Sequence, residues 1–119
     1  MKIAISTSGV GPDAPVDPRF GRAKHFLVFD TETGETVTVD NSQNLNAPQG
    51  AGIQAAATVS RLGAEALITG HCGPKAFQAL AAAGIKIYTG ATGSVSDALA
   101  QFKAGRLNPA QSADVEGHW

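Results

Sequence analysis

The sequence of 119 residues contains a single cysteine, Cys72, and few charged side chains. One cysteine excludes an internal disulfide and any metal site built only from cysteines. Charged residues make up 16% of the chain and the formal net charge is −1. This composition argues against a general nucleic-acid-binding protein, because such proteins need a broad basic face. The apolar runs, such as Phe26 to Phe29, are far shorter than the ~20 residues of a membrane-spanning helix.

The hydrophobic content of 43% is sufficient for one domain with a packed core. Residues 1–5 are typical of a strand and show neither the apolar stretch nor the cleavage site of a signal peptide. We therefore expect a cytoplasmic protein. We also expect a single domain over residues 1–105, followed by a polar, loosely held tail over residues 106–119.

The hydrophobic pattern changes near residue 50. Before it, short apolar or alternating runs predict strands, and a proline- and glycine-rich stretch over residues 9–25 predicts a loop. After it, helices alternate with buried strands. The predicted strands are Lys2–Thr7, Phe26–Phe29, Thr36–Asp40, Ala66–Thr69 and Ile85–Tyr88, and the predicted helices run over 51–62, from Pro74 to Gly84 and from Ser94 to Gly105.

The connections between these segments predict the topology. Short hairpins make the first three strands antiparallel, and helical crossovers make the first, fourth and fifth strands parallel. The resulting α/β fold has the order βββαβαβα, with a five-stranded mixed sheet ordered 3-2-1-4-5 and three flanking helices. This is the outline of the ribonuclease H-like fold.

Three polar turns follow the three parallel strands: Ser6–Gly9, Gly70–Pro74 and Gly90–Ser94. Ligands of open sheets bind beyond the carboxyl ends of parallel strands. The last two turns lead directly into helices, whose N-terminal amides and dipoles favour an anion. The sequence therefore predicts one anion pocket shared by the three turns, rich in amides and hydroxyls and poor in carboxylates.

The loop before the second strand supplies positive charge close to this pocket. If the loop folds over the end of the first strand, Arg19, Arg22 and Lys24 can line the pocket. The alternative is an ordinary solvated loop in which Asp17 pairs locally with the arginines. For Lys24 the solvated interpretation is preferred, and for Arg19 and Arg22 both interpretations stay open.

Cys72 and His71 lie just before the second helix. A thiolate at this position would be stabilised by the helix dipole and could contact a soft metal or sulfide. Cys72 could equally be a small buried apolar residue, and His71 could simply hydrogen-bond a neighbouring turn. One cysteine and one histidine cannot fill a four-ligand structural site, so a permanent zinc site is not expected.

The sequence lacks residues that several classes of enzyme require. Gly9-Val10-Gly11 is followed by Pro12 rather than by a dinucleotide-binding helix, and the sequence has no P-loop. No arginine follows Cys72 closely, as a phosphatase loop would need. The central strands carry no acidic residue that could hold the metal ions of a nuclease. These features favour binding over catalysis.

Four segments resemble, in order and spacing, those of the dinitrogenase iron–molybdenum cofactor biosynthesis family, which contains the NifX/NifB-type domains. The resemblance extends from residue 1 to about residue 105. The segments are Met1–Thr7, Asp17–Arg22, Gly50–Gly52 and Gly70–Phe77.

The resemblance implies a ribonuclease H-like fold without hydrolytic residues, and binding of a molybdenum-containing metal–sulfur cluster. In the branch of the family that this sequence resembles most, the cluster contains molybdenum, copper and sulfide and has no covalent protein ligand. Members that carry the nitrogenase cofactor use a histidine or cysteine near the second turn, a position that His71 and Cys72 match. Relatives in this branch are associated with MinD-type ATPases, which implies a protein partner of that kind.

The leading hypothesis is a noncatalytic carrier of an anionic metal–sulfur cluster, either Mo–Cu–S or similar to the nitrogenase cofactor. A second hypothesis is a regulatory module that binds a phosphorylated small molecule and signals to a MinD-type ATPase. A thiol enzyme centred on Cys72 is the least favoured. His71 and Cys72 are the only candidate metal ligands, and the predicted cluster site consists of Ser8, Arg19, Arg22, Ala51, Ile53, His71, Cys72, Gly73, Ala91, Thr92, Gly93 and Ser94.

Overall fold

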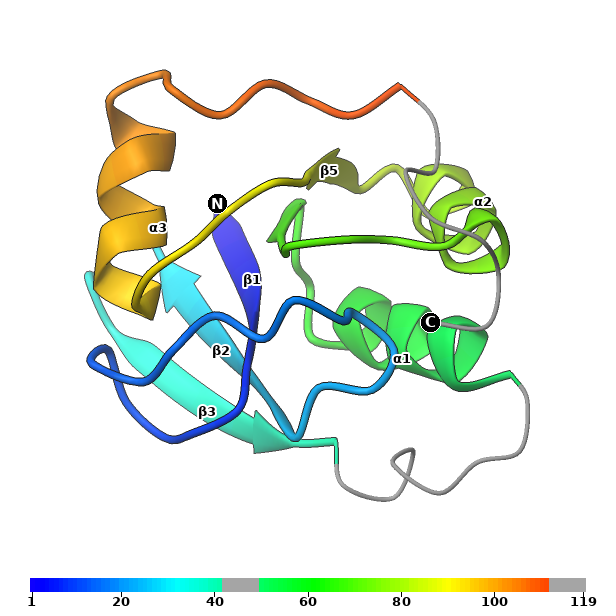
Figure 1. Cartoon of the computed structure of the whole chain (residues 1–119), viewed down its shortest axis with the longest axis horizontal. Helices are drawn as coiled ribbons and strands as arrows, with labels where there is room; N and C mark the ends of the chain where they lie inside the picture. The colour runs from blue at the N-terminus through cyan, green and yellow to red at the C-terminus, as the bar shows by residue number, and fades with distance from the viewer. Residues whose placement is uncertain (42–49, 112–119) are drawn as a thin grey trace.

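The computed structural model describes residues 1–41 and 50–111 and has the predicted order of strands and helices (Figure 1). The observed boundaries agree with the predicted ones to within about two residues. The strands are β1 (Lys2–Thr7), β2 (His25–Asp30), β3 (Thr36–Asp40), β4 (Ala66–Ile68) and β5 (Lys86–Tyr88), and the helices are α1 (Ala51–Arg61), α2 (Pro74–Ala82) and α3 (Val95–Lys103).

The five strands form one mixed sheet in the order β3-β2-β1-β4-β5, which confirms the predicted sheet. β1 is antiparallel to β2, with Ile5 opposite Leu27, and parallel to β4, with Ile5 opposite Ile68. β4 and β5 are also parallel. The carboxyl ends of β1, β4 and β5 therefore lie next to one another at one edge of the sheet.

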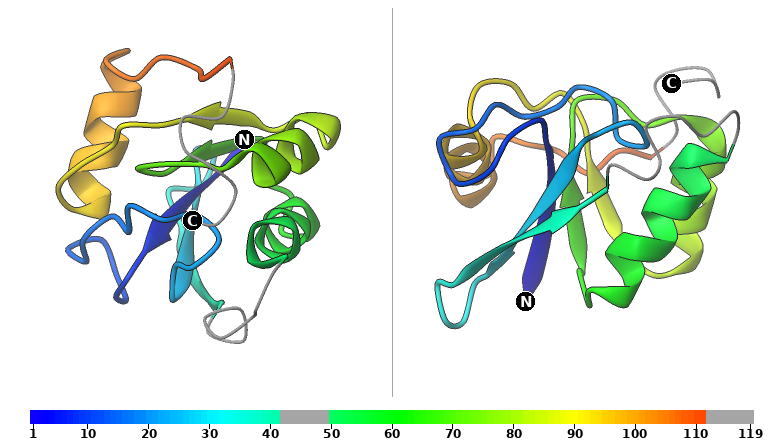
Figure 2. Two further views of the ribbon diagram at one scale, coloured as in Figure 1. Left: turned by 45° about the vertical axis from the view of Figure 1, so that its right-hand side comes forward. Right: turned by 90° about the horizontal axis from the view of Figure 1, so that it is seen from below.

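The helices divide between the two faces of the sheet (Figure 2). α1 and α2 cover one face, and α3 covers the other. Successive residues of a strand point to opposite faces, so Ala4 packs in the core on the α1–α2 side, whereas Ile3 and Ile5 pack in the core on the α3 side. Each loop at the carboxyl edge of the sheet therefore lies on the α1–α2 face, lies on the α3 face, or crosses from one face to the other.

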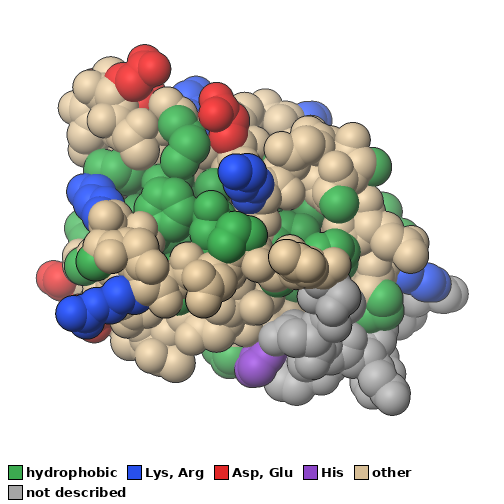
Figure 3. Space-filling view, turned by 90° about the horizontal axis from the view of Figure 1, so that it is seen from above, with side chains coloured by type: hydrophobic (Ala, Val, Ile, Leu, Met, Phe, Trp, Pro, Cys, Tyr) green, Lys and Arg blue, Asp and Glu red, His purple; other side chains and the backbone are tan. Residues whose placement is uncertain are grey.

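Aromatic contacts attach α3 to its face of the sheet. The rings of Tyr88 and Phe102 meet edge to face, with centroids 5.0 Å apart. The Lys103 ammonium lies 4.7 Å from the centroid of the Phe29 ring, within the range of a cation–π interaction. These aromatic side chains are only partly buried. On one face of the molecule, hydrophobic side chains gather with basic and acidic side chains around them (Figure 3).

The chain after α3 returns along β5. Pro109 forms a bridge with Tyr88, and the Ala110 amide donates to the Ile87 carbonyl over 2.6 Å. Leu107 packs against the core on the α3 side. The first part of the segment expected to be a loose tail is thus attached to the domain, and residues 112–119 lie outside the described residues. Within the described ranges, every helix is too short or too polar to cross a membrane.

Candidate functional site

The loop between β1 and β2 is fixed across the carboxyl edge of the sheet. The Ser6 hydroxyl donates to the Asp17 carbonyl (2.9 Å) and lies 2.8 Å from the Thr69 hydroxyl. The Asp17 amide donates back to the Ser6 carbonyl (2.9 Å), and the Thr7 hydroxyl donates to the Pro15 carbonyl (2.7 Å). Because Ser6, Thr7, Asp17 and Thr69 are all buried, these bonds hold the loop firmly against the strand ends.

This loop runs between the turns after β4 and β5, from α3 to α1 (Figure 1). At one end the Val16 amide donates to the Gly93 carbonyl (2.9 Å). At the other end the His71 amide donates to the Pro18 carbonyl (2.8 Å), and Arg19 pairs with His71. The loop is therefore bonded to both turns at the edge of the sheet where the sequence predicted a single open pocket. The second and third turns also meet directly, because the Gly90 amide donates to the Gly70 carbonyl (2.8 Å).

The N-terminus of α3 is satisfied by the protein itself. Ser94 and Asp97 form a capping box, in which the Asp97 amide donates to the Ser94 hydroxyl and the Ser94 amide donates to the Asp97 carboxylate, both over 3.1 Å. The amides of Val95 and Ser96 donate to loop carbonyls over 2.8 and 2.9 Å. With its first amides engaged and a carboxylate beside them, this helix end is unsuited to an anion.

The predicted site residues on this side are consequently separated from the others. The Ser8 amide donates to the Pro15 carbonyl (3.3 Å), and the Ala91 amide donates to the Thr69 carbonyl (3.3 Å). The residues that lie with α3, apart from α1 and α2, are Ser8, Ala91, Thr92, Gly93 and Ser94.

The N-termini of α1 and α2 converge on the opposite face. α1 begins after Gly50 and α2 after Gly73, neither of which has a side chain that could cap the helix. Neither first turn contains an acidic residue. A Cβ atom on Gly52 would lie 2.9 Å from the Ala76 Cβ, so the two first turns touch. Two uncapped positive helix ends therefore lie side by side.

The β1–β2 loop contacts the same place through Gly21. A Cβ atom on Gly21 would lie 2.8 Å from the Gly52 nitrogen and 3.1 Å from the Ala51 carbonyl carbon, both backbone atoms of α1. Only glycine permits this approach. Arg22 follows directly in the chain, and the exposed Ile53 lies in the first turn of α1. The structure thus brings the arginine loop next to the start of α1, which in turn contacts the first turn of α2.

Basic side chains surround these two helix ends. Arg19 is half exposed, and its Nε lies 4.0 Å from the Asp17 carboxylate, which partly offsets its charge. Lys75 is exposed in the first turn of α2. Lys75 was not among the predicted site residues, although its position directly after Pro74 at a helix start was a usable signal.

Cys72 points into the core rather than toward solvent. It is 1% exposed and packs in the same hydrophobic cluster as Phe20, Ala76 and Leu80. Its thiol lies 3.7 Å from the Gly73 carbonyl. This environment supports the interpretation of Cys72 as a small buried apolar residue and argues against a metal ligand.

His71 is half-buried beside it. No group of three or more His, Cys, Asp or Glu side chains suited to a metal ion occurs among residues 1–41 and 50–111. The described site consequently offers amides and cations for an anion, rather than a set of ligands for a bare metal ion.

Comparisons with known proteins agree with this fold. The apo form of the orange protein from Desulfovibrio gigas superposes with a TM-score of 0.93 and is 43% identical, with 96% of each chain covered. A putative NifB protein from Thermotoga superposes with a TM-score of 0.85 and is 34% identical, with 98% of each chain covered.

Sequence comparison extends the relationship. An uncharacterized protein of Methanocaldococcus jannaschii is 30% identical over 109 residues, which cover 90% of this chain and 89% of the relative. Residues 1–105 match the family described as dinitrogenase iron–molybdenum cofactor. The resemblance seen in the sequence is confirmed, and the chain belongs to the dinitrogenase iron–molybdenum cofactor family.

Proposed function

We propose that this protein binds and carries an anionic metal–sulfur cluster, without covalent ligands, where the N-termini of α1 and α2 meet. The family name refers to a metal–sulfur cofactor, and the orange protein and a putative NifB protein share the fold. Carriage requires binding and release rather than bond chemistry, so we propose an accessory role and not an enzyme. We also propose the ribonuclease H-like classification, a single-domain organisation and a cytoplasmic location.

The observation that carries this proposal is the difference between the helix N-termini. α3 has a capping serine and an aspartate in its first turn, whereas α1 and α2 start at glycines and have no acidic residue there. In the described ranges, the amides of Ile53, Lys75 and Ala76 donate to no other protein group. Amides at a helix start have no acceptor within the helix, so these donors suit an external anion.

The surroundings of this site fit a bulky, sulfide-rich cargo. Arg19, Arg22 and Lys75 supply positive charge, and the side chain of Ile53, 46% exposed, offers an apolar surface. Sulfide bound to metals in a cluster is soft and weakly hydrated, so it tolerates such mixed contacts. We propose a molybdenum–copper–sulfide cluster as the cargo, with a nitrogenase-cofactor-like cluster as the related candidate.

The proposal is tested by assembling the cluster on the protein. The metal-free protein is mixed with tetrathiomolybdate and copper, desalted, and analysed by visible absorption and by molybdenum and copper content. We expect a coloured complex of fixed stoichiometry. Arg19→Glu and Lys75→Glu should each weaken retention about fivefold, because an exposed charge near a helix end contributes ~1 kcal/mol. Lys86→Glu, an equal charge change on the exposed start of β5, is the matched control.

A colourless protein that releases all metal on desalting would overturn the proposal. Equal losses in Lys86→Glu would show an effect of net charge rather than of this site. Heat stabilisation by nucleotides or sugar phosphates, with none by molybdenum–sulfur species, would favour the regulatory module acting with a MinD-type ATPase, since helix N-termini also bind phosphate.

A further inference from the structure

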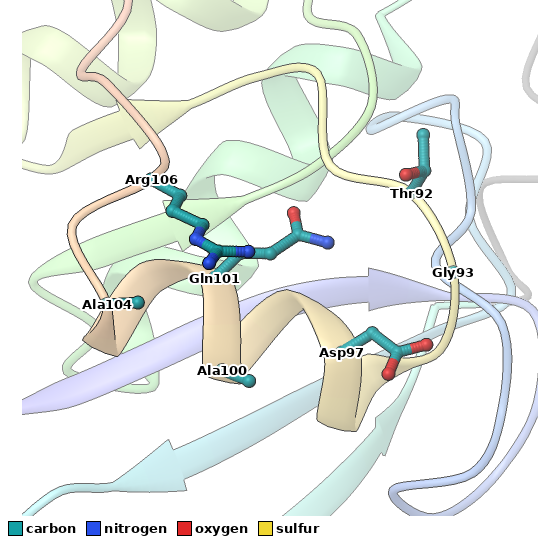
Figure 4. Close-up of a pocket in the computed structure, with 7 residues that line it drawn as sticks. All are labelled: Thr92, Gly93, Asp97, Ala100, Gln101, Ala104 and Arg106. Atoms are coloured by element: carbon teal, nitrogen blue, oxygen red, sulfur yellow. The ribbon is translucent and has the colours of Figure 1, made fainter.

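An open groove runs along the outer side of α3, on the other face of the sheet from the proposed cluster site (Figure 4). Its volume is about 520 Å³, which lies in the range of ligand-binding clefts. The turn before α3 and the segment after it form its ends. The lining residues are Thr92, Gly93, Asp97, Ala100, Gln101, Ala104 and Arg106.

The two ends of the groove carry opposite charges. Asp97 lies at one end and Arg106 at the other, with the Gln101 amide between them (Figure 4). Arg106 is exposed and forms no ion pair within the part of the chain that the structure describes. Only one Asp97 oxygen, Oδ2, accepts the capping bond from Ser94. Both ends can thus take a charged group of opposite sign from a partner.

The length of the groove along α3 suits a short extended chain. From Asp97 to Ala104, the residue at the C-cap of α3, the helix rises by about 10 Å at 1.5 Å per residue. An extended peptide covers the same length in about three residues. Three of the lining residues, Gly93, Ala100 and Ala104, have small or no side chains, so a peptide backbone can approach closely. The side chains of Thr92 and Gln101 can form hydrogen bonds with it.

We propose that this groove docks an extended segment of a partner protein with one acidic and one basic side chain about three residues apart. The acidic side chain pairs with Arg106 and the basic side chain pairs with Asp97. Because the groove lies on the α3 face and the proposed cluster site on the α1–α2 face, the partner can bind while the other site stays accessible. This inference does not depend on what the α1–α2 site carries.

The test titrates four capped peptides into the isotopically labelled full-length chain and follows the amide signals by NMR. The peptides share one neutral extended sequence and carry Glu and Lys, two Glu, two Lys or two Gln at positions three apart. We expect the Glu and Lys peptide to bind most tightly, with signal changes at Thr92, Gly93, Gln101 and Arg106. Its binding should weaken as ionic strength rises.

Arg106→Glu should weaken binding of the Glu and Lys peptide about tenfold and should make the peptide with two Lys the preferred one, because the groove then carries two negative ends. Lys86→Glu is the matched control and should leave the order of the peptides unchanged. Identical behaviour of all four peptides, absence of signal changes in the groove, or an unaltered preference in Arg106→Glu would each overturn the proposal. Unchanged cluster retention in Arg106→Glu separates this result from the proposed function.

Discussion

The contact between Gly21 and α1 gives a prediction that separates stability from binding. In Gly21→Ala, the new methyl group would lie 2.8 to 3.1 Å from backbone atoms of residues 51 and 52. Backbone cannot rotate away as a side chain can, so the loop and the start of α1 must move apart. Overpacking of this kind costs about 1–3 kcal/mol. For a chain of this length that corresponds to a fall of about 4–12 °C in Tm.

The same movement should weaken the proposed cluster site. The arginine loop would shift away from the two helix ends, so we expect the fraction of cluster retained after desalting to fall severalfold. Gly34→Ala is the control. Its Cβ meets no atom within 4 Å, but its φ of +76° is unfavourable for alanine, which costs about 1–2 kcal/mol. It should therefore lower Tm without affecting retention.

Thermal unfolding followed by circular dichroism, together with metal analysis of both variants, completes this comparison. If Gly21→Ala unfolds at the temperature of the unchanged protein, the close approach is not rigid and the argument fails. If both variants lose cluster equally, retention reflects global stability instead of the contact between the loop and α1.

Three further substitutions test individual features. Asp97→Ala removes the capping box and should cost about 1 kcal/mol of unfolding free energy, measured by urea denaturation, while cluster retention stays unchanged. Cys72→Ser places a hydroxyl in an apolar cluster and should cost about 1–3 kcal/mol, with an unaltered absorption spectrum of the complex; a lost spectrum would restore the thiol as a ligand. Ser6→Ala leaves the Asp17 carbonyl without its hydroxyl donor and should cost about 1–3 kcal/mol, and a loss below the error of denaturation would contradict the described anchoring.

The sheet was predictable because its strands and helices carry strong local patterns. The continuous apolar run of β2 and the helical spacing of Val95, Ala98, Leu99 and Phe102 in α3 each predict one kind of element. Short hairpins and helical crossovers then leave few topologies. The capping of α3 by Ser94 and Asp97 was also visible in the sequence and is confirmed.

The arrangement of the loop around the three turns could not be predicted, because it depended on the path of an irregular segment. That path is fixed by long-range bonds, such as the one from the Val16 amide to the Gly93 carbonyl, which leave no periodic pattern. The contact between Gly52 and Ala76 likewise depends on how two helices pack. The direction in which Cys72 points, into the core, is set by the turn geometry rather than by residue type.

The attachment of Pro109 and Ala110 to β5 makes the two borders of the sheet unequal. Along β5 the outward carbonyl of Ile87 already has an intramolecular donor, so another molecule cannot easily extend the sheet there. β3 forms the other border, with Val37 60% exposed and no such cover from the described residues. If another strand were added to this sheet during self-association, it would therefore pair with β3 rather than with β5.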